Sequence, residues 1–180
     1  MPQPILSVRE MSASDIPLII QYWLSATPAY LQGMGVDLSK MPAKEQWEAM
    51  LNTQLTQDYD QKASYCIILE IDGKAIGHCN VNKIEYGKEA YMHLHIWDVT
   101  NRKRGWGARL VRMAIPCFFN NLQLKKLCCE PWALNPAPNN TLKKIGFRFV
   151  KRYTTTPGYL NFEQEVNLWE LEAEFLTDFA

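Results

Sequence analysis

Long apolar runs are missing from this sequence, and so are the features that mark export. No apolar run among the 180 residues approaches the roughly 20 residues that a membrane span needs. The N-terminal stretch MPQPILSVRE lacks the charged start, apolar middle and small-residue cleavage site of a signal peptide. We therefore expect a cytoplasmic protein with no membrane partner.

Paired cysteine motifs are also absent. The five cysteines show neither the spacing of a zinc site nor a redox CxxC pair; they are Cys66, Cys79, Cys117, Cys128 and Cys129. They lie in apolar surroundings, so we expect buried thiols and no metal. An apolar strand raises the pKa of a thiol, which disfavours Cys128 or Cys129 as a nucleophile.

Internal repeats, low-complexity tracts and linkers are absent as well. A chain of 180 residues, 47% of them hydrophobic, is long enough for one substantial core and short for two domains. We expect a single domain over residues 1–180.

Acidic residues are scarce in one segment, although the formal net charge is zero. Between residues 102 and 152, twelve Lys or Arg stand against a single acid, Glu130. Such asymmetry favours an anionic partner for this segment, either a phosphorylated cofactor or a nucleic acid. A solvated basic surface is the simpler alternative.

Hydrophobic periodicity predicts an α/β (α+β) chain whose strands share one mixed sheet. Strands are expected at 5–10, 64–71, 75–86, 90–97, 125–130, 147–154 and 165–172, and helices at 12–26, 43–56, 105–121 and 139–145. The stretch 33–42 reads as a loop. Asp72-Gly73 and Gly87 mark the turns of an antiparallel meander. Pro116 lies inside the third helix, where we expect a kink or an early end.

Two glycines, Gly105 and Gly107, open the helix expected at 105–121, although glycine costs helix stability. A helix start leaves backbone N–H groups unsatisfied and carries partial positive charge, so bare backbone there lets a pyrophosphate lie directly on it. Arg102, Lys103 and Arg104 add attraction. The stretch therefore predicts an anion-binding site.

The segment RKRGWG, with Arg102, Gly105 and Gly107 in the defining places, resembles the pyrophosphate loop of the GNAT superfamily of acyl-CoA-dependent N-acyltransferases. That loop reads Gln or Arg, two residues, Gly, one residue, then Gly or Ala. NPAPNNTLKKIGF is a second similarity, because Asn135 lies eleven residues before the Gly146-Phe147 pair. The order of elements agrees over nearly the whole chain. The branch that includes ribosomal-protein N-terminal acetyltransferases is the most similar.

The resemblance implies a fold and a cosubstrate. The fold is a single mixed, mostly antiparallel sheet of about seven strands flanked by about four helices, with the fourth and fifth strands splayed around the pantetheine arm of acetyl-CoA. No metal is implied. The implied cofactor-binding residues are Ile96, Trp97, Arg102, Lys103, Arg104, Gly105, Trp106, Gly107, Ala108 and Asn135. On spacing alone, Asn135 is equally a turn former before Pro136.

Two of the three histidines share a face of the strand expected at 90–97, because side chains alternate along a strand. His93 and His95 lie on this face with Tyr91 and Trp97. Imidazole titrates near neutral pH, which suits a base or proton relay for an attacking amine, and some family members that acetylate arylalkylamines carry a similar His-x-His. His93 and His95 are therefore the catalytic candidates. Half-buried histidines satisfied by cross-strand partners are the alternative, and His78 is expected to be structural.

The general acid is unassigned, because this chain departs from the family pattern. Leu142 stands where the family often has a tyrosine, and Pro138 replaces the usual serine. Tyr153, Cys129 or water are the alternatives.

Four aromatic residues lie in the two N-terminal helices, which line the acceptor side in this family; they are Tyr22, Trp23, Tyr30 and Trp47. Core packing is the simpler interpretation of Trp23 and Trp47.

The predicted function is an N-acetyltransferase that moves the acetyl group of acetyl-CoA to a primary amine by direct attack in a ternary complex. The acceptor is an amine-bearing small molecule or a protein or peptide. Dimers are frequent in the family, although the sequence does not specify an oligomeric state.

Three other functions compete with this prediction. An acyl-CoA sensor without turnover would need the same residues. A nucleic-acid-binding module using 102–152 is disfavoured, because the basic residues follow no recognition pattern. A dinucleotide-binding oxidoreductase is disfavoured because Leu110 replaces the third glycine of its motif.

Overall fold

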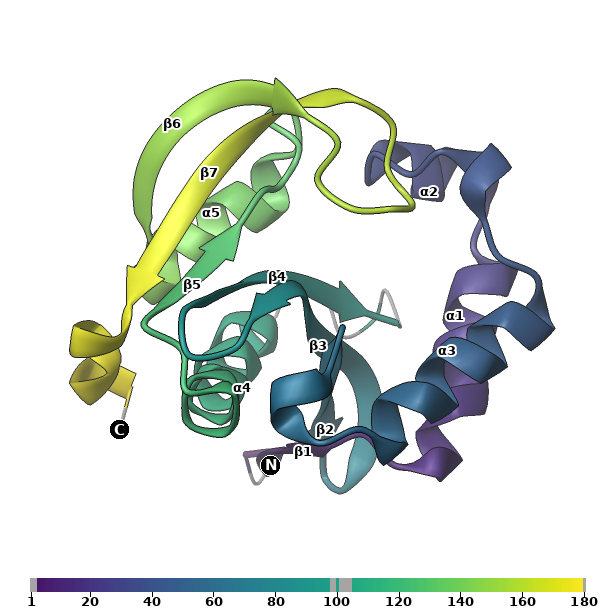
Figure 1. Cartoon of the computed structure of the whole chain (residues 1–180), viewed down its shortest axis with the longest axis horizontal. Helices are drawn as coiled ribbons and strands as arrows, with labels where there is room; N and C mark the ends of the chain where they lie inside the picture. Colours follow the sequence, from purple (N-terminus) through teal and green to yellow (C-terminus); the bar gives the residue numbers. More distant parts are fainter. Residues whose placement is uncertain (1–2, 98–99, 101–104, 180) are drawn as a thin grey trace.

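Seven strands form one mixed sheet in the order β1-β2-β3-β4-β5-β7-β6 (Figure 1). The computed structural model describes residues 3–97, 100 and 105–179. The strands are β1 (Leu6–Glu10), β2 (Tyr65–Ile71), β3 (Lys74–Glu85), β4 (Glu89–Ile96), β5 (Lys126–Cys129), β6 (Arg148–Thr155) and β7 (Gln164–Glu172). Neighbouring strands are antiparallel except β4 and β5, which are parallel. The predicted mixed, mostly antiparallel sheet is confirmed.

Helices cover both faces of the sheet, and the described residues contain five α-helices where about four were expected. They are α1 (Ile16–Ser25), α2 (Pro28–Gly33), α3 (Lys44–Thr56), α4 (Trp106–Leu122) and α5 (Pro136–Ile145). The described chain also has the 3-10 helices η1 (Ala13–Asp15), η2 (Leu38–Lys40), η3 (Tyr59–Gln61) and η5 (Ala173–Phe179). The loop expected at 33–42 therefore contains η2. Within the described chain, no helix has the length and apolar character needed to cross a membrane.

Two helix starts differ from the prediction for the same reason, a proline in the first turn. Helix α2 was not predicted; the Thr27 side chain accepts from Tyr30 N at its start, and Pro28 follows at once. Helix α5 begins at Pro136 and not at 139. Proline fits the first helical position, because the N–H that it lacks has no partner there. Six residues are also too few to show a helical period.

Two hydrophobic cores lie on opposite faces of the sheet. One packs α4 and α5 against β2, β3 and β4, and the other packs α1 and α3 against the opposite face. Strand β2 is buried on both sides, since Ile67, Ile68 and Leu69 are all 0% exposed. Figure 1 shows this arrangement, with α1 and α3 beside each other and α4 on the other side of the strands.

Helix α4 continues through Pro116 to Leu122, so the early end proposed for it is wrong. The turns beyond the proline bury Phe118, Phe119 and Leu122 almost completely. Burial of large apolar side chains yields roughly 1.5–3 kcal/mol each, whereas a proline in a helix costs roughly 3 kcal/mol. Tertiary packing therefore outweighs the local penalty.

Strands β4 and β5 pair over only three residues before they diverge. The last pair is Tyr91 with Cys128, yet β4 runs on to Ile96. Figure 1 shows the two strands pointing apart beyond this position. The expected splay between the fourth and fifth strands is confirmed.

The loop between β6 and β7 reaches across to the segment that follows α2 (Figure 1). The carbonyl of Gly35 accepts from Asn161 Nδ2 at 2.9 Å, Phe162 N at 3.2 Å and Gln164 Nε2 at 3.1 Å. Val36 and Asn161 also form an isolated β-bridge. These bonds tie the C-terminal loop to the N-terminal helices.

Gly35→Ala should lower the free energy of unfolding by about 1–3 kcal/mol. Gly35 has φ +82°, and a Cβ there would lie 2.3 Å from Gln164 Oε1. Urea unfolding measures the change. Gly33→Ala is the matched control, because a Cβ at Gly33 meets nothing within 4 Å, and its stability should be unchanged or slightly higher. Equal losses in both variants would contradict the role of Gly35.

Candidate active site

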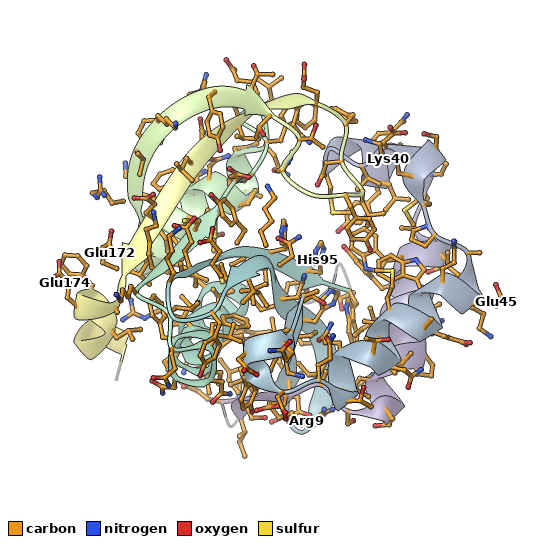
Figure 2. The ribbon with its side chains drawn as sticks, viewed as in Figure 1. Arg9, Lys40, Glu45, His95, Glu172 and Glu174 are labelled. Carbon is orange, nitrogen blue, oxygen red and sulfur yellow. The ribbon has the colours of Figure 1, made fainter. Side chains whose placement is uncertain are left out.

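One face of β3 and β4 carries a row of polar side chains. The antiparallel register pairs His78 with His95, Asn80 with His93 and Asn82 with Tyr91. Figure 2 shows His95 near the middle of the molecule, whereas the other labelled side chains lie at its periphery. The structure thus places the two predicted histidines side by side and adds His78, Asn80 and Asn82 to them.

This polar row forms the floor of a cavity of about 170 Å³. Helices α1 and α3 form one wall, in which Trp23 and Trp47 stack with their ring centroids 5.6 Å apart. The loop residues 158–161 and the segment after α2 form the rim. Trp23 and Trp47 belong to the N-terminal core, which confirms their core-packing interpretation, and they also line this cavity.

His93 is neutral at physiological pH. Its Nε2 lies 3.2 Å from Asn82 Oδ1, and because a carbonyl oxygen only accepts, Nε2 carries the proton and Nδ1 keeps its lone pair. Burial, with a smaller effect of the Lys83 charge, lowers the pKa of His93 to about 4. The ring is therefore satisfied on one side by a neighbouring strand, as in the structural alternative, and has an acceptor nitrogen left.

His95 begins a chain of hydrogen bonds that leads away from the sheet. Its Nδ1 lies 3.2 Å from the Tyr22 hydroxyl on α1, which lies 3.1 Å from the Tyr30 hydroxyl on α2. Tyr22 is buried and Tyr30 is half-buried. The aromatic residues of the N-terminal helices thus connect a candidate histidine with the outer layer of the protein.

His78 has the contacts of a structural residue. It is buried, and its Nδ1 accepts from Trp97 Nε1 at 2.8 Å. Its ring stacks on His95 with centroids 4.8 Å apart. Burial lowers the pKa of His78 to about 3. The His78 ring is therefore neutral where it stacks against His95.

The start of α4 presents open backbone. Gly105 adopts φ +80° at the N-cap, and no side-chain hydrogen bond caps the helix among the described residues. Gly107 follows in the first turn, where an added Cβ would meet nothing within 4 Å. Packing among the described residues therefore does not require a glycine at position 107. Trp106 and Ala108 pack on the adjacent core.

Three predicted cofactor contacts, Arg102, Lys103 and Arg104, lie outside the described residues.

The open edge of β4 is formed by alternate residues. Trp97 N donates to Ile76 O at 2.9 Å, and backbone groups alternate in direction along a strand. The groups of Leu94 and Ile96 therefore point away from β3, toward the gap before β5. The contact of Ile96 with a pantetheine arm stays a prediction. Trp97 donates its N–H to β3, so only its carbonyl would be available for the predicted contact with the coenzyme.

Asn135 caps helix α5. Its Oδ1 accepts from Ala137 N at 3.3 Å, and its carbonyl accepts from the buried Asn139 Nδ2 at 2.7 Å. Asn139 Oδ1 in turn accepts from Asn167 and Trp169. The turn-forming interpretation of Asn135 is confirmed, and this polar network holds Asn135 in place at the end of the gap.

Residues 6–148 match the family model described as the acetyltransferase (GNAT) domain. The chain belongs to the GNAT acetyltransferase family. No curated protein sequence matches it.

The fold of this GNAT domain is shared with solved acetyltransferases. It is similar to RimL, a ribosomal L7/L12 alpha-N-protein acetyltransferase in complex with coenzyme A, with TM-score 0.74, 15% identity and 93% coverage of both chains. A Salmonella typhimurium acetyl transferase that modifies the N-terminal serine of ribosomal protein L7/L12 has TM-score 0.72, 17% identity and coverage of 93% and 94%. Vibrio cholerae spermidine N-acetyltransferase, in complex with CoA and spermine, has TM-score 0.70, 16% identity and coverage of 96% and 98%.

The candidate general acids of this GNAT domain hold their protons tightly. The Tyr153 hydroxyl donates to Glu130, and burial together with that carboxylate raises the pKa of Tyr153 well above its usual range. Burial raises the pKa of Cys129 in the same way. Neither group is therefore an ordinary proton donor, and a thiolate nucleophile is disfavoured as predicted.

The free cysteines are buried at four of the five positions, as expected, and Cys117 is half-buried. Glu130 is also bound by Lys83 at 3.4 Å. The sequence had marked Glu130 only as the single acid of a basic segment, and its partners could not be read from spacing.

The stability of this GNAT domain should fall as the pH drops from about 6.5 toward about 4. His78 and His93 have ordinary pKa values of 6.5 that folding lowers to about 3 and about 4. The unfolded chain therefore binds these protons first, and the stabilisation is complete only above about pH 6.5. The pKa of Asp15 is lowered from 3.8, so its contribution is lost only at lower pH.

Urea unfolding at several pH values between about 5 and about 7 measures this slope. In His78→Gln, the slope should decrease by up to about 1.4 kcal/mol per pH unit, because the amide oxygen still accepts from Trp97 without titrating. A stability that does not change over this range would contradict the prediction.

Proposed function

We propose that this GNAT domain transfers the acetyl group of acetyl-CoA to a primary amine by direct attack within a ternary complex. Acetyl-CoA-dependent acetylation of amines is the general reaction of the family. One observation carries the finer proposal: the open edge of β4 borders the gap to β5, and the same strand presents His93 and His95 to a cavity. The two reactants would thus meet across a single strand.

The chain offers backbone groups along one path for the coenzyme. The amides of 105–108 and the basic residues Arg102 to Arg104 would hold the pyrophosphate, and Leu94, Ile96 and Asn135 would contact the pantetheine arm. Support comes from the space beside Gly107 and from the end of β4–β5 pairing after Tyr91. Acetyl-CoA, when bound, supplies the acetyl group as an activated thioester.

The acceptor nitrogen would attack the acetyl carbonyl carbon from the cavity. A nitrogen–carbon bond forms, the carbon–sulfur bond breaks, the nitrogen loses one proton and the departing sulfur gains one. His93 Nδ1 accepts a hydrogen bond from the amine N–H and so orients the lone pair of the amine nitrogen. A pKa of about 4 makes this ring a weak base, so its part in the step is to position the amine. His95 is hydrogen-bonded to the Tyr22 hydroxyl, which is hydrogen-bonded to the Tyr30 hydroxyl. This chain would carry the proton that the amine loses away from the cavity.

A second candidate is a sensor that binds the coenzyme without turnover. Leu142 is buried in the core, and the Tyr153 hydroxyl donates a hydrogen bond to Glu130, so no assigned side chain stands ready to protonate the sulfur. Water can fill that role in an enzyme, and only turnover separates the two functions.

A panel of amines incubated with acetyl-CoA tests the proposal, with the product detected by its mass. This readout is unaffected by the protein's own thiols. Acetylated amine in amounts exceeding the enzyme supports the proposal. Coenzyme binding without any acetylated product would instead support the sensor.

Gly107→Leu should abolish coenzyme A binding and leave stability unchanged or slightly higher. A Cβ at this position meets no described protein atom within 4 Å, whereas the leucine side chain should cover the amides of the first turn, and leucine favours helix more than glycine does. Calorimetric titration with coenzyme A measures the loss. Asn120→Leu, an exposed position near the other end of α4, should bind normally. Retained binding in Gly107→Leu would refute the pyrophosphate site.

His95→Ala, which breaks the proposed proton route, should lower kcat by roughly 10²–10⁴-fold, and His93→Ala by a smaller factor because His93 only orients the amine. Both should change the Kd for coenzyme A by less than about threefold, because both side chains face the cavity. Steady-state kinetics and calorimetry on the same samples separate the two effects. A variant that keeps full kcat would remove its histidine from the mechanism.

A further inference from the structure

The cavity above the histidines carries no formal charge on its described lining. Its walls are apolar, with Ile19, Trp23, Trp47, Leu51 and Leu160 among them. Its polar residues are amides, imidazoles and hydroxyl groups. Among the residues that the structure describes, no Asp, Glu, Lys or Arg lines it.

We propose that the acceptor is a primary monoamine with an apolar, uncharged body, and that the cavity rejects diamines and polyamines. This inference rests on the proposed function. The reacting nitrogen attacks as an uncharged amine, so it needs no carboxylate partner on the uncharged floor of the cavity. A second ammonium group would be carried into the apolar wall without a carboxylate to pair with it, and an unpaired buried charge is strongly disfavoured.

The charges nearest to the cavity also oppose a polycation. Lys83 lies close enough to His93 to lower its pKa, and Lys40 Nζ donates to Asn161 O at the rim, at 2.7 Å. Glu130 is already engaged by Tyr153 and Lys83. Lys40 also pairs with Asp37 at 3.6 Å. Asp37 and Glu130 at the margin of the cavity are therefore each already paired with a lysine, and neither is a free carboxylate for a second ammonium group.

The stacked tryptophans do not replace a carboxylate. Trp23 and Trp47 are nearly parallel, at 15°, so each ring has one face covered by the other and only one left for a cation. Trp47 Nε1 is buried and has no hydrogen-bond partner within the described chain. A neutral oxygen on the acceptor could satisfy this N–H, whereas an ammonium group has no lone pair to offer it.

The test compares n-pentylamine with cadaverine, which has the same five-carbon chain and a second amine. We expect kcat/KM for pentylamine to exceed that for cadaverine by at least about 100-fold, because only the diamine buries an unpaired charge. A second matched pair, peptides that differ only in an N-terminal Leu or Lys, covers protein acceptors, and the Leu peptide should be preferred. Equal or reversed preference in the pair that is acetylated would overturn the inference.

Met50→Glu provides the complementary test. Met50 lines the cavity from α3 and is 42% exposed, and glutamate is a good helix former. A carboxylate here should raise kcat/KM for cadaverine, or for the Lys peptide, by about tenfold relative to the neutral variant Met50→Gln. An equal response of both variants would count against the electrostatic explanation.

The two levels of the proposal fail differently. Acetylation of cadaverine as fast as pentylamine, or of both peptides alike, overturns the monoamine inference and leaves the acetyltransferase standing. Absence of transfer to every acceptor, with coenzyme A still bound, overturns the proposed function and this inference with it.

Discussion

The divergence of β4 from β5 is the constraint on which the candidate site depends. Pairing stops after Tyr91 and Cys128, and two residues past the end of β5 the chain reaches Pro131, which has no N–H to continue a ladder. The backbone of Leu94 and Ile96 is left facing a gap. The same break in the sheet thus opens the gap in which we propose that the coenzyme lies, on the strand that also carries the two histidines.

The acceptor side depends on segments that are far apart in the chain. The floor comes from β3 and β4, the walls from α1 and α3, and the rim from the loop between β6 and β7. Gly35, in the segment after α2, ties this loop to the N-terminal helices, because its carbonyl accepts from three residues of the loop and the following strand. The cavity is thus electrically neutral inside, while Lys83 and Glu130 pair at its margin.

Much of this architecture could be predicted from local sequence patterns. All seven strands were placed within a few residues, since alternation of apolar and polar residues reflects burial of one strand face. The same alternation put His93 and His95 on one face, and the two glycines before α4 indicated bare backbone. Each of these features is set by neighbours within a few positions, which a linear sequence displays.

The sequence alone therefore determined the strands, the histidine pair and the glycine-rich helix start, because these depend on short-range periodicity and backbone freedom. Tertiary structure alone decided that α4 continues through Pro116, that His95 meets Tyr22, and that Trp97 commits its N–H to β3. The physical reason is that burial and hydrogen bonding join residues distant in the chain, and their gain can exceed any local preference. The charge of the cavity also depends on tertiary structure, because the fold determines which side chains line it.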